Sequence, residues 1–383
     1  MPAESIPVDQ VRALIGRPGS RYQLPTPALI VDVEAFERNV KHMARRAKAA
    51  GLVLRPHSKT HKSATIARRQ IAAGAVGVCC TKLGEAEALV KAGLRKLLVT
   101  SPIVGDDTTG RAVALARIDP EVMFVVDHEQ QVDALASAAS SAELTLSVLV
   151  DVDVGMARTG VANPPAAVSL AGKIADRSSL RLVGVQGYGG TWQHIVGESE
   201  RRKAVAAGMT RLSATVQELR ESGHLVPLVT GGGTGTFAAD AALKVLNEVQ
   251  PGSYIFMDNQ YRDALGEDED GGFQQSLFVQ ARVVGINAEK WVTVDAGLKA
   301  FATDGPVPRI TDPRFASDGY FYFGDEHGGV TRPAGGNGIA LGERVELTPP
   351  HCDPTVDRYS VYHFVRGDTL VDVVEIEAAR QSQ

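Results

Sequence analysis

Regular alternation of apolar strand-like runs and helix-like segments is the feature of this sequence that most restricts its fold. Alanine- and leucine-rich segments, each about long enough for a crossover helix, separate the apolar runs over the first two thirds of the chain. Such βα alternation predicts a parallel sheet, and eight units close a (β/α)8 barrel with its active site at the carboxyl ends of the strands. Nine strands are predicted, so one is spare: residues 28–33, 54–59, 77–81, 96–100, 122–127, 146–152, 182–188, 228–232 and 252–257.

A second, mainly antiparallel β domain is predicted after residue 275, where the helical pattern stops. Alternating or β-rich runs take over, and the last two form a hairpin that turns at residues 366–368. The first strand, at residues 28–33, could join this domain or close the barrel, and its composition favours neither. The predicted strands of the β domain are residues 277–284, 291–295, 320–323, 344–347, 361–365 and 370–376.

Composition places the chain among globular proteins with a full core, because 44% of its 383 residues are hydrophobic. A net charge of −5 with evenly spread Lys and Arg predicts no nucleic-acid partner, and residues 267–270 are interpreted as a solvated acidic loop. Neither a signal-peptide pattern nor a membrane-spanning apolar run is present, so we expect a cytoplasmic protein. Cys79, Cys80 and Cys352 cannot form a disulfide framework and match no structural zinc pattern.

Residues 54–62 concentrate basic and ring-bearing side chains at the end of a predicted buried strand. If residues 54–59 form a strand, its alternation points Arg55, His57 and Lys59 to one side. Lys59 would be partly desolvated and flanked by cations, and both effects lower the pKa of a lysine and favour Schiff-base chemistry. A solvated basic loop is the alternative interpretation, for which a proline and two histidines are poor choices.

A glycine-rich loop at residues 229–236 follows one predicted strand and precedes a helix. Its backbone N–H groups could form a phosphate cradle, although the loop has neither the Walker nor the Rossmann spacing. A plain tight turn is the alternative. Gly252, Ser253 and Tyr254 support the phosphate interpretation, because loops after the last two strands of such barrels frequently bind phosphate.

Two further groups of residues fall on neighbouring predicted strand ends. Arg158 lies on a glycine-flanked loop, where it suits an anionic oxygen, and Tyr188 and His194 follow one strand later. These two rings could stack on a ligand or move protons. A surface arginine and a core tyrosine are the alternatives.

A candidate metal site lies in the β domain. In an extended segment His351 and Asp353 point the same way and could share a divalent cation, while Cys352 points elsewhere. Two protein ligands leave an open site that water or substrate completes. A chance His-x-Asp pair is the alternative, and the flanking prolines, which fix the backbone, argue against it.

In this order and spacing, the motifs make the chain similar to the D-threonine aldolases and the related 3-hydroxy-D-aspartate aldolases. The resemblance rests on residues 55–62, 230–235, 252–254, 325–328 and 351–355 and extends over nearly the whole chain. It implies the alanine-racemase-like fold of pyridoxal-phosphate enzymes. The barrel would span residues 34–265, and the β domain residues 1–33 and 266–383, so that the first strand joins the β domain.

The same resemblance implies the cofactor and the site. Lys59 would hold pyridoxal phosphate as a Schiff base, with Arg158 and Tyr188 beside the ring, and His351 and Asp353 would bind Mn²⁺ or a similar ion such as Mg²⁺. The cofactor phosphate would be bound by Gly233, Thr234, Gly252, Ser253 and Tyr254. A homodimer is also expected.

The implied activity is retro-aldol cleavage of D-β-hydroxy-α-amino acids to glycine and an aldehyde. The metal would lower the pKa of the β-hydroxyl, and the candidate base is His194 or a metal-bound water. His57 and His61 are expected to position the lysine segment or the cofactor. Relatives carry a larger polar residue in place of Gly189, so we expect a widened pocket here.

Other functions stay open at this point. The similar D-serine dehydratases place a Cys where Asp353 stands, so the hard carboxylate favours an aldolase over a D-serine or 3-hydroxyaspartate dehydratase. A non-catalytic pyridoxal-phosphate-binding protein would have no reason to keep a β domain with His351 and Asp353. A metal-dependent barrel hydrolase without an organic cofactor is the remaining alternative.

Overall fold

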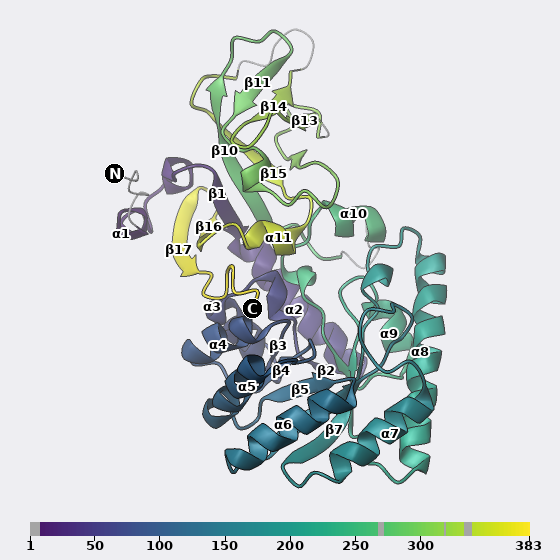
Figure 1. Cartoon of the computed structure of the whole chain (residues 1–383). Coiled ribbons are helices and arrows are strands. Elements are labelled where there is room, and N and C mark those ends of the chain that lie inside the picture. Colours follow the sequence, from purple (N-terminus) through teal and green to yellow (C-terminus); the bar gives the residue numbers. More distant parts are fainter. Residues whose placement is uncertain (1–7, 267–271, 318, 333–338) are drawn as a thin grey trace. The chain divides into compact units, whose positions relative to one another are not determined.

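The chain forms two compact units (Figure 1). The computed structural model describes residues 8–266, 272–317, 319–332 and 339–383. The barrel unit comprises Met43–Gly252 with Gln381–Gln383, and the β unit comprises Met1–His42 with Ser253–Arg380.

The division within helix α2 (Val33–Ala49) has a packing cause. In its first half Phe36 packs against the rings of Phe256 and Phe364, with centroids 6.4 and 5.6 Å apart. The amide of Asn39 also donates to the Ile255 carbonyl at 3.1 Å. These contacts assign the start of α2 to the β unit, whereas we predicted that the barrel begins at residue 34.

The barrel unit is a closed (β/α)8 barrel, which confirms the predicted fold class. Its strands are β2 (Val53–Leu54), β3 (Val78–Cys80), β4 (Leu97–Val99), β5 (Met123–Val126), β6 (Leu146–Asp151), β7 (Leu180–Gly187), β8 (Leu228–Gly231) and β9 (Glu248–Val249). They pair in parallel in the order β2-β9-β8-β7-β6-β5-β4-β3. A parallel bridge between His57 and Cys79 joins the two ends of this order.

Helices lie outside the barrel strands and alternate with them along the chain (Figure 1). Amphipathic periodicity explains their placement, since each buries an apolar stripe against the sheet. They are α3 (Ala64–Ala72), α4 (Leu83–Lys91), α5 (Asp106–Ile118), α6 (Glu129–Ser141), α7 (Pro164–Ala175), α8 (Glu198–Glu221) and α9 (Phe237–Leu243). Within the strands, Cys79, Leu98, Val125 and Leu149 form a buried apolar cluster.

The β unit contains the spare strand. Strand β1 (Ala28–Asp32) pairs antiparallel with β10 (Leu277–Gly285) and parallel with β16 (Val361–Arg366). The other pairs of this sheet are antiparallel, as predicted. Its remaining strands are β11 (Trp291–Val294), β12 (Arg309–Ile310), β13 (Tyr320–Tyr322), β14 (Gly328–Thr331), β15 (Arg344–Thr348) and β17 (Thr369–Glu375).

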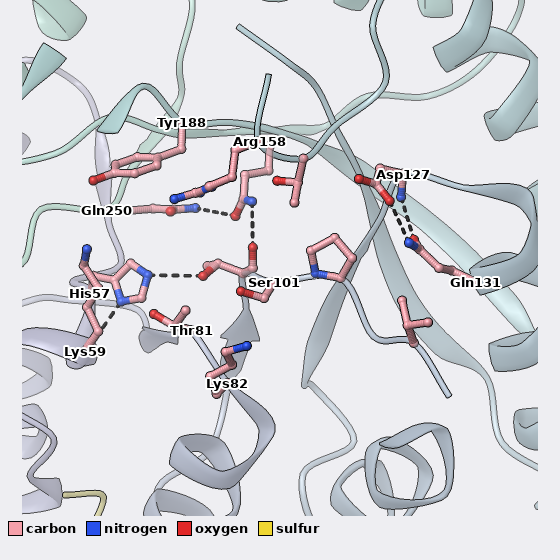
Figure 2. Close-up of a pocket in the computed structure, with 15 residues that line it drawn as sticks. His57, Lys59, Thr81, Lys82, Ser101, Asp127, Gln131, Arg158, Tyr188 and Gln250 are labelled. Carbon is pink, nitrogen blue, oxygen red and sulfur yellow. Dashed lines mark hydrogen bonds between the residues drawn. The ribbon is translucent and has the colours of Figure 1, made fainter. Parts of the chain in front are cut away.

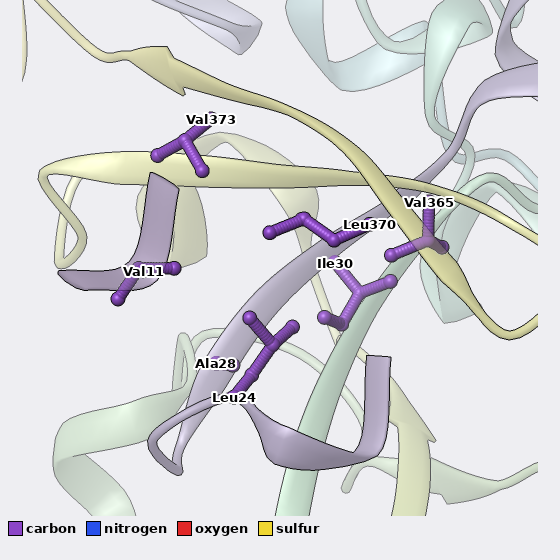
Figure 3. Close-up of a cluster of buried hydrophobic side chains, with 7 residues drawn as sticks. All are labelled: Val11, Leu24, Ala28, Ile30, Val365, Leu370 and Val373. Atoms are coloured by element: carbon purple, nitrogen blue, oxygen red, sulfur yellow. The ribbon is translucent and has the colours of Figure 1, made fainter. Parts of the chain in front are cut away.

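An apolar core holds β1 in this sheet (Figure 3). Ile30 of β1 packs with Val365 of β16 and Leu370 of β17, and Val11 of helix α1 (Val8–Arg12) completes the cluster. Burial of such side chains contributes roughly 1.5–3 kcal/mol each. The amino-terminal strand is therefore fixed by residues more than 300 positions away, as the parallel pairing of Ile30 with His363 illustrates.

The strand predicted at residues 252–257 is wrong. The eighth barrel strand is β9, and the 3₁₀ turn η4 (Ser253–Ile255) follows it. The two residues of β9 are too few and too polar to produce a strand pattern, and Pro251 and Gly252 end it. The apolar run that attracted the prediction is instead buried in the β unit, where Phe256 packs against Tyr362 with ring centroids 5.5 Å apart.

The predicted strand at residues 54–59 is only partly correct. Strand β2 ends at Leu54, and Ser58–Thr60 form the 3₁₀ turn η2. Strand alternation therefore does not orient Lys59. Strands β12 and β14 and helices α10 (Asn259–Leu265) and α11 (Cys352–Val356) were not predicted, and the acidic run at 267–270 lies outside the described residues. No helix in the described ranges has the length and apolar character needed to cross a membrane.

Candidate active site

A cavity of about 480 Å³ lies among the segments that follow the carboxyl ends of the barrel strands (Figure 2). Lys59, Arg158 and Tyr188, three of the predicted site residues, line it together. Its volume falls in the range of sites for small molecules. The other lining residues are mostly polar: His57, Thr81, Lys82, Thr100, Ser101, Pro102, Val104, Asp127, Gln131, Thr159, Gln186 and Gln250.

His57 fixes the segment that carries Lys59. Its Nδ1 accepts a bond from the Lys59 backbone N–H at 3.4 Å, and its Nε2 lies 3.2 Å from the Thr100 hydroxyl. That hydroxyl donates its own proton to the Cys80 carbonyl at 3.1 Å, so Nε2 is the donor to Thr100. The two contacts require the neutral Nε2–H tautomer of His57, which links turn η2 to the end of β4.

A buried ion pair, which sequence reasoning missed, anchors the other end of turn η2. Lys62 has a left-handed backbone with φ 52°, and its Nζ lies 3.2 Å from Oε1 of Glu85. Glu85 also accepts the backbone N–H of Thr81 at 2.7 Å. A non-glycine residue in this conformation is strained, and such strain persists only where surrounding contacts impose it. The turn that presents Lys59 is thus held at both ends.

Two cationic side chains lie close to the ring of Tyr188. Lys59 Nζ lies 5.8 Å from the ring centroid, and the guanidinium carbon of Arg158 lies 5.5 Å from it. Both distances are within reach of cation–π attraction, worth about 0.5–2 kcal/mol each. Two cations beside an aromatic face suit a flat, anionic ligand.

Buried polar side chains form a network beside this ring. Asp151 accepts bonds from Gln186 Nε2 at 3.0 Å and from the Thr159 hydroxyl at 2.7 Å. Burial raises the pKa of Asp151 to about 6, although these two bonds lower it. Gln250 Nε2 donates to Gln186 Oε1 at 3.3 Å. We did not single out these residues from the sequence, but their signal is positional, because Asp151 ends β6, Gln186 lies near the end of β7 and Gln250 follows β9.

The predicted phosphate loop after β8 is buried, and two of its backbone N–H groups are bonded to protein side chains. The Gly233 N–H donates to the Thr236 hydroxyl at 3.0 Å, and the Gly235 N–H donates to Oε1 of Gln193 at 3.0 Å. A Cβ on Gly252 would lie 2.5 Å from the Thr60 hydroxyl, so glycine is required where the chain passes turn η2. Thr234 is also buried.

Ser253 and Tyr254 belong to the β unit, at the start of turn η4. The Tyr254 side chain is fully buried and packs against Phe273 with centroids 5.6 Å apart, so its ring is a core residue. The Ser253 hydroxyl donates to Oδ1 of Asp353 at 3.4 Å. This bond connects a predicted phosphate residue with a predicted metal ligand.

His194 and Gly189 differ from expectation. His194 is half-buried and is not among the residues that line the cavity, so its role as a base stays a prediction. The widened pocket expected at Gly189 is wrong. A Cβ there would collide with the ring of Trp192, which already fills the space, and a Cβ on Gly208 would collide with the same ring.

The predicted metal ligands do not lie in an extended segment. His351 is the N-cap of helix α11, and Asp353 lies in the first turn of that helix, because the Asp258 carboxylate accepts the Cys352 N–H at 2.7 Å and starts the helix. Nδ1 of His351 lies 2.8 Å from Oδ2 of Asp304. Burial alone would lower the pKa of His351, but the neighbouring carboxylates outweigh burial and raise it. The carboxylates around His351 therefore favour a positive charge on its imidazole.

Comparison with known proteins agrees with this architecture. Residues 31–260 match the family model described as the alanine racemase N-terminal domain, and residues 276–365 match a putative serine dehydratase domain. A D-threonine aldolase from Arthrobacter sp is 36% identical over 361 residues, which cover 93% of each protein. A 3-hydroxy-D-aspartate aldolase from Paracoccus denitrificans (strain Pd 1222) is 34% identical and covers 93% of this chain and 92% of its own.

A solved structure gives the same result. The crystal structure of D-threonine aldolase from Filomicrobium marinum superposes with a TM-score of 0.90 at 36% identity, covering 94% of this chain and 98% of that one. The resemblance stated from the motifs is thereby confirmed. The chain belongs to the alanine-racemase-like family of pyridoxal-phosphate enzymes that contains the D-threonine aldolases and 3-hydroxy-D-aspartate aldolases, which are carbon–carbon lyases.

Proposed function

We propose that the protein is a pyridoxal-phosphate- and divalent-metal-dependent aldolase that cleaves D-β-hydroxy-α-amino acids of the D-threonine type to glycine and an aldehyde. The observation that carries the proposal is the Lys59 amine beside the Tyr188 ring, in a barrel cavity of a chain 36% identical to a D-threonine aldolase. An amine at the carboxyl end of a barrel strand has the chemistry and the access to bind a cofactor aldehyde.

Lys59, Arg158 and Tyr188, which line the cavity, fit the aldehyde and the ring of pyridoxal phosphate. When bound, the cofactor supplies a ring that accepts the electron pair of a broken bond at the substrate α-carbon. Lys59 would hold it through Nζ, Tyr188 would pack on the ring, and Arg158 would bind an anionic oxygen. Gly233, Thr234, Gly252 and Ser253 would hold the phosphate, together with the backbone of Tyr254, whose ring is used in the core.

The β unit contains donors that suit a hard divalent cation. A carboxylate at Nδ1 of a histidine is a common arrangement around metals, because it fixes the tautomer that leaves Nε2 as the ligand, and Asp304 occupies this place at His351. Asp353 adds a carboxylate oxygen. Within the described residues no group of three or more His, Cys, Asp or Glu side chains could hold a metal, so water or substrate would complete the shell. A cation there would lower the pKa of the substrate hydroxyl, and His194 is our candidate proton acceptor.

The first test is product formation. We expect glycine and acetaldehyde from D-threonine with added pyridoxal phosphate and Mn²⁺, and a loss of both with a chelator. A panel of D-threonine, D-phenylserine and 3-hydroxy-D-aspartate then defines the preferred aldehyde. If none of these substrates yields glycine, the proposal is wrong. Ammonia with an oxo acid would instead identify a dehydratase, which the match at residues 276–365 keeps as the second candidate.

Chemical trapping tests the role of Lys59. Borohydride reduction and peptide mapping should place the cofactor on Lys59, and Lys59→Ala should lose both labelling and activity. Lys82→Ala is the control, since Lys82 is another lysine that lines the cavity, and it should still be labelled at Lys59. Labelling at any other lysine would contradict the assignment.

Metal titration tests the β-unit site. Asp304→Ala should weaken Mn²⁺ affinity about 10- to 100-fold while leaving cofactor labelling intact, because it removes the partner of the His351 imidazole. Unchanged affinity would exclude this site. The homodimer and the cytoplasmic location stay predictions, and sedimentation analysis of the purified protein tests the former.

A further inference from the structure

One buried amide connects the two loops that follow β7 and β8. Gln193 is 1% exposed and follows the 3₁₀ turn η3 (Gly190–Trp192). Its Oε1 accepts the N–H of Gly235 at 3.0 Å, and its Nε2 donates to the carbonyl of Gly189 at 3.2 Å. The same Nε2 lies 3.2 Å from the Thr236 hydroxyl. One side chain thus forms hydrogen bonds with the backbone of both loops.

The glycine loop is shaped around this side chain. A Cβ on Gly233 would lie 2.5 Å from Oε1 of Gln193, and a Cβ on Gly235 would collide with the Gln193 carbonyl. Thr236 also stabilises the loop, because its hydroxyl accepts the Gly233 N–H at 3.0 Å and donates to Asp240 at 2.6 Å. Glycines are therefore required by the close approach of Gln193, and not only by an approaching ligand.

We infer that Gln193 is a positioning residue that holds the glycine loop after β8 in a phosphate-binding shape and ties it to the loop that carries Tyr188. The inference rests on the proposed function to the extent that the phosphate belongs to pyridoxal phosphate. Gly189, whose carbonyl Gln193 binds, directly follows Tyr188. Gln193 consequently sets the shape of the phosphate end of the cofactor site, and its bond to the Gly189 carbonyl connects that end to the loop that carries Tyr188.

Loss of the Gln193 side chain should weaken only the binding of the ligand's phosphate group. Without Gln193, the Gly235 N–H and the Gly189 carbonyl lose a buried partner and the glycine loop can rearrange. The groups beside the ring, Lys59 and Arg158, keep their contacts with Tyr188. A ligand with a phosphate should therefore lose affinity, whereas the same ligand without a phosphate should not.

The experiment compares pyridoxal phosphate with pyridoxal on the apoprotein, following the absorbance of the lysine adduct. Gln193→Ala should weaken binding of pyridoxal phosphate about 10- to 100-fold, the effect of losing two or three buried hydrogen bonds. Its affinity for pyridoxal should stay within about twofold of wild type. Inorganic phosphate should compete with pyridoxal phosphate more weakly in the variant than in wild type.

Two further variants keep the test decisive if Gln193→Ala folds poorly. Thr236→Val removes the hydroxyl that bonds both Gly233 and Gln193, and it should give the same selective loss. Thr215→Val is the matched control, because Thr215 is equally buried and its hydroxyl donates to the Arg211 carbonyl of its own helix at 3.0 Å. It should change neither affinity.

The outcomes separate this inference from the proposed function. Equal losses for pyridoxal phosphate and pyridoxal overturn the inference, because they show general damage to the barrel. Unchanged binding of both ligands also overturns it. A wild-type protein that binds neither ligand overturns the proposed function and this inference with it.

Discussion

Replacing Asp240 by asparagine should make the barrel unit more stable at neutral pH. Asp240 is 1% exposed and lies behind the glycine loop, where its Oδ2 accepts the Thr236 hydroxyl at 2.6 Å. In the described part of the chain its Oδ1 is buried without a hydrogen-bond partner. Burial raises the pKa of Asp240 to about 7, against the lowering effect of Thr236 and the Gly233 N–H.

The sign follows from proton binding. The unfolded chain releases this proton near pH 4, whereas the folded protein keeps it until about pH 7. The stabilising contribution of Asp240 is therefore complete below pH ~4 and is lost as the pH rises through ~7. Each unit of pKa difference corresponds to about 1.4 kcal/mol, so wild type loses at most about 4 kcal/mol across this window.

Asparagine does not titrate, so the variant lacks this loss. Its amide NH₂ would occupy the place of Oδ1 and would cost about 1–3 kcal/mol if unpaired, but this cost does not depend on pH. The stability of Asp240→Asn relative to wild type should thus rise by about 1.4 kcal/mol per pH unit up to pH ~7 and then level off. The slope, and not the value at one pH, is the quantity to measure.

Urea unfolding of the apoprotein between pH 5 and pH 8 gives this slope. The chain has two tryptophans, so a Trp291→Phe background leaves Trp192 as a reporter within the barrel unit. Asp153→Asn is the control. Burial would raise the pKa of Asp153, but the N–H groups of Gly155, Ala157 and Met156 outweigh it and lower that pKa, so the difference should be constant above pH 5. A constant difference for Asp240→Asn as well would refute the reasoning.

Two further predictions concern packing and charge in the barrel unit. Gly208→Ala should destabilise the protein by about 1–3 kcal/mol, because its Cβ would collide with the Trp192 ring, whereas Gly172→Ala, with nothing within 4 Å, should stabilise it by about 0.5–1 kcal/mol. Thermal unfolding measures both, and equal effects at the two helical positions would contradict the packing argument. Lys62→Met and Glu85→Gln should each cost about 3–5 kcal/mol, since each leaves a buried charge without the partner now 3.2 Å away. The double variant should cost less than the worse single variant, and a simple sum in urea titrations would show that the pair does not interact.

The barrel was predictable because its signals are local. A helix of 3.6-residue period and a short buried run produce distinct patterns wherever they occur, and regular alternation then restricts the topology. The partner of β1 was not predictable from its residues, since its four buried apolar positions fit either sheet. Strand β9 was missed because two residues, one of them Glu248, form no pattern, although the barrel cannot close without their pairing to β2 and β8.

The candidate site likewise contains residues that were predictable from local sequence and residues whose role depends on contacts between distant segments. Lys59 was found because an unusual composition surrounds it in the sequence, even though a 3₁₀ turn and not a strand presents it. Gln193 has no such surroundings, and its role exists only because Gly235, 42 positions later, approaches it. Gly189 shows the converse error: a missing side chain was interpreted as open space, but Trp192 fills that space from three positions away. The role of a side chain that joins two loops therefore cannot be recognised from the sequence before the fold brings the loops together. The phosphate selectivity of Gln193→Ala measures how much of the site depends on this connection between loops.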